Sequence, residues 1–137
     1  MRRIALLALF LAVPAQASDI GGRWVTTERD SVVEIAPCSA GTGGAALCGR
    51  VVRLLKAVEG GPAIDRNNPD AALRSRPLVG LPILLALVPK GKGYAGRIYD
   101  PRNGRTYRSV VAAQPDGKLK VSGCIGPLCR SFAWTRG

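Results

Sequence analysis

The sequence contains no histidine, and this absence limits the chemistry that the protein can perform. Without an imidazole, neither a Ser-His-Asp nor a Cys-His catalytic system can be built, and the usual zinc sites that use histidine are excluded. Acidic residues are also few, nine against 20 lysines and arginines. Carboxylates are therefore the remaining candidates for acid–base chemistry, and we expect no cofactor and no metal.

Long hydrophobic runs are missing as well. The main apolar segments, residues 4–13 and 77–88, are well short of the ~20 residues that a spanning helix needs. Aromatic residues make up 5% of the chain, which does not supply the aromatic girdles of an outer-membrane barrel. We therefore expect a protein that does not span a membrane.

The first 17 residues have the layout of a secretory signal peptide. Arg2 and Arg3 precede the apolar run at 4–13, and small residues stand at Ala15 and Ala17. This pattern predicts cleavage after Ala17 and export, in the bacterial manner, to the periplasm or the exterior.

Residues 18–137 have the length of a single domain. Removing Arg2 and Arg3 with the leader gives a net charge of +9. In an exported protein the natural counterpart of this charge is the anionic cell envelope, not nucleic acid. A solvated basic surface without a specific partner is the alternative, since the charges are scattered.

Four cysteines in an exported chain predict two disulfides. Three pairings exist, and loop entropy alone favours the long links. Each close pair, however, brackets a predicted turn between strands, where facing residues lie near bridging distance. We therefore expect Cys38–Cys48 and Cys124–Cys129. A zinc site is the rival, but the C-x2-C spacing is absent.

Short apolar stretches alternate with turn signals, which is typical of an antiparallel β protein. Pro82 interrupts the fourth stretch and is expected to bend it. In the last stretch Arg130, Phe132 and Trp134 share one face. About eight sequential strands close naturally into an all-β, up-and-down barrel that is filled or holds one small ligand. The expected strands cover residues 23–28, 31–36, 47–55, 77–88, 94–99, 105–112, 119–123 and 128–134.

One long polar insertion, residues 60–76, separates the third and fourth strands. Asn68 is the expected N-cap, Pro69 the first helical position and Asp70 a first-turn acid. Pro77 ends the segment. These residues predict one short helix or helical turn.

The same insertion supplies most of the candidate ligand-binding residues, at a mouth of the barrel. A calcium loop that starts at Asp65 is disfavoured, because Asp70 and Arg76 stand where glycine and glutamate are required. A capped turn in which Asp65 and Asp70 pair with Arg74 or Arg76 is the structural alternative. Tyr99 and Asp100 join the candidates as a pair that could transfer a proton; such tyrosines more often only pack. The full set is Asp65, Asn67, Asn68, Asp70, Arg74, Arg76, Tyr99 and Asp100.

The two ends of the barrel sequence carry tryptophan and arginine. Closing the barrel brings Trp24 of the first strand close to Trp134 and Arg136 of the last. A guanidinium can then lie on an indole face, which contributes about 0.5–2 kcal/mol.

Several sequence blocks spread over residues 22–136 carry a family resemblance. The blocks are Gly22-Arg23-Trp24, Val33-Glu34-Ile35 with Cys38, Cys48-Gly49-Arg50-Val51, the segment from Asp65 to Leu81, the segment from Gly96 to Tyr107, Leu119 to Cys124, and Trp134-Thr135-Arg136. Together these blocks resemble the secreted bacterial family of domain of unknown function 2147. The resemblance implies a lipocalin-like β-barrel and export, and it implies no established activity and no catalytic residues. No tryptophan stands in residues 90–93, where relatives are expected to carry one.

Three functional hypotheses follow from the sequence. The first is a binding module for a small ligand or an envelope component, held at a mouth lined by the insertion. The second is a structural or interaction protein with a filled barrel that docks on anionic envelope surfaces. The third is a hydrolase that uses Asp65, Asp70 or Asp100.

Overall fold

The computed structural model describes residues 20–39 and 46–137. The predicted leader lies outside these residues. Eight strands and one 3-10 turn make up the regular structure of the described chain. They are β1 (Gly22–Val25), β2 (Ser31–Pro37), β3 (Leu47–Leu54), η1 (Ala71–Leu73), β4 (Pro82–Lys90), β5 (Gly93–Asp100), β6 (Arg105–Ala113), β7 (Leu119–Ile125) and β8 (Leu128–Arg136).

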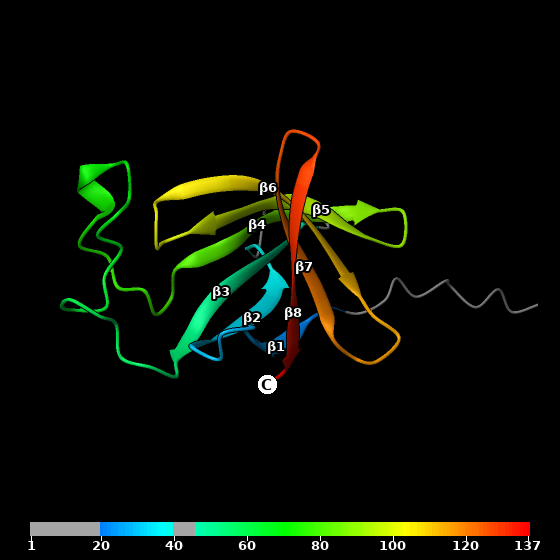
Figure 1. The fold of residues 1–137 in the computed structure, drawn as a ribbon, viewed down its shortest axis with the longest axis horizontal. Helices are drawn as coiled ribbons and strands as arrows, with labels where there is room; N and C mark the ends of the chain where they lie inside the picture. Colours follow the sequence, from blue (N-terminus) through cyan, green and yellow to red (C-terminus); the bar gives the residue numbers. More distant parts are fainter. Residues whose placement is uncertain (1–19, 40–45) are drawn as a thin grey trace, which may run out of the picture.

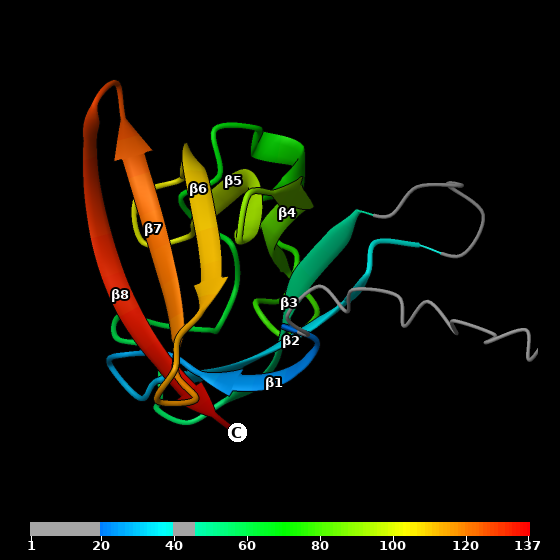
Figure 2. The same ribbon diagram turned by 90° about the vertical axis from the view of Figure 1, so that its right-hand side faces the viewer.

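The strands form a closed antiparallel barrel in which each strand pairs with its neighbours in the sequence. Closure is made by β8 against β1, with Trp24 opposite Arg136 and Val25 opposite Thr135. Figures 1 and 2 show the last strand returning to the first. The predicted eight-stranded, all-β, up-and-down barrel is confirmed.

Apolar side chains fill the barrel at the end away from the long insertion. Alternate residues of a strand point to opposite faces, and the inward set here is aliphatic and aromatic. Trp24 enters this core, and its indole nitrogen donates to the carbonyl of Ile20 at 2.9 Å. The core residues at this end are Ile20, Trp24, Val33, Ile35, Leu87, Tyr94, Val111 and Leu119.

The fourth strand differs from its predicted bounds. It begins at Pro82 and not at residue 77, because proline lacks the N–H that a ladder requires and is best placed at a strand start. The preceding segment is tied to β3 instead, since Leu81 accepts from the N–H of Val51 at 3.0 Å. The expected bend lies further on, where Ala86 has a φ of +50° and the register shifts.

The insertion contains the one short helical turn that was predicted, η1. Its N-cap is Asp70 and not Asn68: the Asp70 carboxylate accepts from the N–H of Ala72 at 3.0 Å. The side-chain oxygen of Asn68 instead accepts from the backbone N–H of Asp70, at 2.8 Å, in the turn just before η1. Both residue types accept backbone N–H groups equally well, so the sequence pattern could not separate two adjacent caps.

Alternate connections of an up-and-down barrel lie at the same end. The β1–β2, β3–β4, β5–β6 and β7–β8 connections therefore share one end, which also carries the insertion. The β7–β8 hairpin reaches furthest toward the top of the molecule in both views (Figures 1 and 2).

Candidate functional site

A cavity of about 610 Å³ occupies the end of the barrel that carries the long insertion. Its walls are inward-facing residues of β3 to β8, and most of them are apolar. Three connections form its rim: the β1–β2 loop, the β5–β6 turn and the β7–β8 hairpin. The apolar lining comprises Val51, Ile83, Ile98, Val121, Ile125, Leu128, Phe132 and Trp134.

Arg102 ties together two of the rim connections. Its guanidinium pairs with Asp100 at 3.0 Å in its own turn and with Glu28 of the β1–β2 loop at 3.7 Å. The hydrogen bond that the guanidinium donates to Asp100 is the main reason that the pKa of Arg102 is raised. Asp30 also has a partner, the hydroxyl of Thr26 at 2.7 Å. The acidic groups of the rim are thus all engaged.

Arg130 is the remaining charged residue of the cavity lining. It lies on the same face of β8 as Phe132 and Trp134, as the alternation predicts, and nearer the mouth. Among the described residues its side chain has neither an ion pair nor a hydrogen-bond partner. The sequence predicted only that Arg130 shares a face with Phe132 and Trp134, and not that this face lines a cavity.

The cavity wall has a gap beside Arg130. The partner of Arg130 across the β7–β8 ladder is Gly123, which has no side chain. On the β6 side the ladder partner of Gly123 is Ser109. Tyr107 lies two residues further along β6, and a Cβ added at Gly123 would lie 3.7 Å from Ile98 and 3.9 Å from the Cβ of Tyr107. Tyr107 accepts from the amide of Asn103 at 3.0 Å and has no acceptor for its own hydroxyl proton among the described residues.

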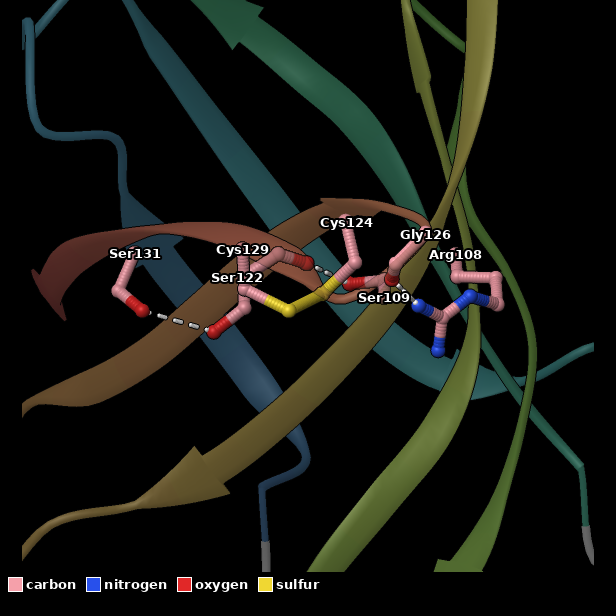
Figure 3. The surroundings of a disulfide bond; sticks show 7 residues. All are labelled: Arg108, Ser109, Ser122, Cys124, Gly126, Cys129 and Ser131. Carbon is pink, nitrogen blue, oxygen red and sulfur yellow. Dashed lines mark hydrogen bonds between the residues drawn. A yellow bond between two sulfur atoms is a disulfide. The ribbon is translucent and has the colours of Figure 1, made fainter.

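A disulfide fixes the rim hairpin beside this gap. Cys124 and Cys129 join the ends of the β7–β8 turn (Figure 3). Two residues further from the turn on each strand, the hydroxyls of Ser122 and Ser131 share a hydrogen bond of 3.0 Å (Figure 3). Arg108 of β6 donates to the carbonyl of Gly126 at the tip (Figure 3). The other bridge, Cys38–Cys48, lies at the opposite end of the barrel, so both predicted pairings are confirmed.

The predicted binding residues of the insertion form a network on the outside of the barrel. Asp65 is fully buried and accepts from Asn68 at 2.8 Å, Arg76 at 3.0 Å and Tyr99 at 2.6 Å. Ile98 lines the cavity, so the Tyr99 side chain points to the outer face of β5. Burial, and then the hydrogen bond to Asp65, raise the pKa of Tyr99 to about 12.

The rest of this network positions the cavity rim. Asn67 donates to the carbonyls of Pro101 and Arg102, at 3.1 and 3.0 Å. The contact is close enough that a Cβ at Gly104 would lie 1.9 Å from the carbonyl oxygen of Asn67. Gly104 also has a φ of +72°, so both the turn and the contact require glycine. Arg74 donates to the carbonyl of Asn68 at 2.7 Å.

The sequence-predicted site therefore divides in two. Asp100 borders the cavity, and Asn68 and Arg76 border a smaller outer hollow of about 300 Å³. Tyr99 stands in the wall between the two and borders both. Asp65 pairs with Arg76 as the structural alternative predicted, whereas Asp70 pairs with neither arginine and caps η1. Ligand binding by the insertion residues stays a prediction. Asp65, Asp70 and Asp100, the carboxylates of the hydrolase hypothesis, each have a partner.

The barrel closes on the predicted tryptophan–arginine contact. The guanidinium of Arg136 lies over the ring of Trp24, 4.0 Å from its centroid, and also donates to the carbonyl of Gly21 at 2.6 Å. Trp134 is buried in the same core. Gly22 has a φ of +101°, and a Cβ there would lie 3.0 Å from the Arg136 guanidinium. Gly22, two residues before Trp24, thus makes room for the guanidinium of Arg136.

The family model described as an uncharacterized protein conserved in bacteria (DUF2147) matches residues 22–136. The chain belongs to this family. It is also similar to a solved structure, protein HP1028 from the human pathogen Helicobacter pylori, which belongs to the lipocalin family. The two chains are 27% identical, with a TM-score of 0.69 over 87% of this chain and 83% of that chain. No curated protein matches this chain.

The described residues offer no metal centre and no helix long and apolar enough to cross a membrane. Chemically, the cavity provides apolar surface, one unpaired guanidinium and one phenol hydroxyl. This arrangement is suited to holding a molecule.

Proposed function

We propose that the protein binds a small amphipathic molecule inside the barrel. The observation that carries this proposal is the cavity of about 610 Å³, open at the rim and lined mainly by apolar side chains. Ligand pockets of proteins usually measure about 300–1,000 Å³ and combine apolar walls with a few polar groups. The likeness to HP1028, a member of the lipocalin family, supports the same conclusion.

We also propose that the protein functions outside the cytoplasm. Both disulfides suit an oxidising compartment, in line with the leader predicted from the sequence. We take the working form to be residues 18–137, one domain in the periplasm or outside the cell.

A neutral dye tests binding in the cavity. N-phenyl-1-naphthylamine is uncharged, and its fluorescence rises in apolar surroundings. Gly123→Leu places a side chain in the cavity without a conformational penalty, because Gly123 does not have a positive φ and an added Cβ meets only ordinary contacts, the nearest at 3.7 Å. The native protein should bind the dye saturably, and Gly123→Leu should weaken binding at least about tenfold, or 1.4 kcal/mol.

The matched control is Val110→Leu, which enlarges an exposed side chain on the outer face of β6. It should leave dye affinity unchanged. Absence of saturable binding to the native protein, or equal binding by Gly123→Leu, contradicts the proposal.

A second candidate function rests on the β7–β8 tip. Ile125 and Leu128 are 67% and 77% exposed, the highest fractions among the large apolar residues of the described chain. The Cys124–Cys129 bridge brackets them, and Arg108 contacts the tip at Gly126. Aliphatic side chains next to basic ones are suited to the interface of an anionic lipid bilayer. Docking there would place the cavity mouth against the lipid.

Vesicle sedimentation tests this second function. The native protein should sediment with phosphatidylglycerol vesicles more than with phosphatidylcholine vesicles, and less at high salt. The double variant Ile125→Ser/Leu128→Ser should lose most of the binding. The control Val79→Ser/Val88→Ser removes two exposed valines away from the tip, one in the connection before β4 and one in β4, and should bind as the native protein does. Equal loss in both variants, or no preference for the anionic lipid, rules out docking through the tip.

A further inference from the structure

We propose that the ligand of the cavity carries an anionic head group, a carboxylate, and that Arg130 binds it at the mouth. This inference rests on the proposed binding function and adds the charge of the ligand and its orientation. Three observations support it: the pairing of the rim charges, the gap over Gly123 and the position of Arg130 along β8.

The pairing of the charged groups leaves one of them available. Asp100 and Glu28 are engaged by Arg102, and Asp30 accepts from Thr26. A cationic ligand would have to compete with these contacts. Arg130 has no partner among the described residues, so an anion can bind its guanidinium without breaking an existing contact. Arg–carboxylate pairs are often bidentate and are stronger than neutral hydrogen bonds.

The gap over Gly123 gives the head group a place. Gly123 does not have a positive φ, and an added Cβ would meet nothing closer than 3.7 Å, so neither conformation nor packing requires glycine here. Gly123, Arg130 of β8 and Tyr107 of β6 all line the cavity, so the absent side chain widens the cavity where a head group can reach both Arg130 and Tyr107. The Tyr107 hydroxyl already accepts from Asn103 and can donate its proton to a carboxylate oxygen.

The position of Arg130 sets the orientation of the ligand. Phe132 and Trp134 follow Arg130 inward on the same face of β8, and Trp134 is buried. Four residues of a strand span about 13 Å, so an apolar tail of that length can lie along β8 below the head group. Arg130 itself is exposed at the mouth, where the carboxylate can keep part of its hydration.

Three amphiphiles with the same tail and different heads test the inference. Decanoate, decanol and decyltrimethylammonium displace N-phenyl-1-naphthylamine from the native protein, from Arg130→Gln and from the matched control Arg97→Gln. Arg97 is exposed on the outer face of β5 and has no partner among the described residues, so both variants lose one unpaired positive charge.

Native protein should bind decanoate about tenfold more tightly than decanol, and decyltrimethylammonium most weakly. Arg130→Gln should remove the preference for decanoate and leave decanol binding unchanged, whereas Arg97→Gln should keep it. The preference should also shrink at high salt.

Two results overturn the inference and are distinguishable. If decanol binds as tightly as decanoate, or if Arg130→Gln keeps the preference, the cavity binds a ligand but Arg130 does not select an anion. If neither the dye nor any amphiphile binds, the proposed function itself fails, and the inference fails with it.

Discussion

The hydroxyl of Tyr99 donates a hydrogen bond of 2.6 Å to the carboxylate of Asp65, and this contact fastens the insertion to the outer face of the barrel. Asp65 is fully buried, and Arg76 and Asn68 complete its partners. Through the neighbouring Asn67, the insertion also holds the β5–β6 turn. The polar block of the sequence thus supports the cavity rim from outside.

Loss of Asp65 should destabilise the protein strongly. Asp65→Ala removes the acceptor of three hydrogen bonds and leaves their donors unpaired, so the free energy of unfolding should fall by about 3–5 kcal/mol. Urea unfolding measures the change. The control is Glu59→Gln in the same connection, an exposed residue that should change stability by less than about 0.5 kcal/mol. Equal effects would contradict a structural role for Asp65.

Stability should fall with pH in the alkaline range because of Tyr99. Its pKa is raised from 10.0 to about 12, so the folded protein favours the neutral phenol. This contribution is fully present below pH 10 and is lost as the pH rises through about 12. Relative to Tyr99→Phe, native protein should lose on the order of 2–3 kcal/mol over that range. Urea midpoints of both proteins at each pH measure it, and parallel curves would contradict the assignment.

Closure of the barrel should depend on Arg136. Arg136→Gln removes the cation from the face of Trp24 and the hydrogen bond to Gly21, and should cost about 1–2 kcal/mol of stability. Arg97→Gln removes an equal charge elsewhere and should cost less than about 0.5 kcal/mol. Thermal unfolding of the two variants compares them. A loss no larger for Arg136→Gln would contradict the closure contact.

The two disulfides should differ in their effect on ligand binding. Each closes a short loop, so replacing either pair by serines should cost about 2–3 kcal/mol of stability. Cys124–Cys129 borders the cavity mouth, whereas Cys38–Cys48 lies at the other end of the barrel. Only the Cys124→Ser/Cys129→Ser variant should weaken dye binding. A loss of affinity in both variants would point to general destabilisation.

The barrel could be predicted from the sequence because its signals are local. Alternating apolar residues and turn signals such as Asn103-Gly104 locate most strands within a few residues. The fourth strand was predicted to begin too early because residues 77–81 are apolar, and they pack on β3 as a connection. Hydrophobicity alone does not distinguish a buried connection from a strand.

The cavity could not be predicted in the same way. Whether a barrel is hollow depends on how side chains from distant strands fill it. The gap at Gly123 is recognised only once the structure brings Arg130 and Tyr107 to the same cavity wall. Alternation predicted that Arg130 shares a face with Phe132 and Trp134, but only the structure shows that this face lines a cavity and that Arg130 lacks a partner among the described residues. The binding site was predicted in the insertion because polar residues are concentrated there. In the structure most of those polar groups form hydrogen bonds with one another.

One measurement tests the central claim most directly: the location of a bound ligand in a crystal. The native protein would be crystallised with an alkyl alcohol that carries a bromine at the end of its tail, and the anomalous signal of bromine would be mapped. We predict bromine inside the barrel, in the cavity next to Val121, Phe132 and Trp134. Bromine only on the outer surface or at the β7–β8 tip, or no bound bromine at saturating alcohol, would contradict a ligand-binding cavity.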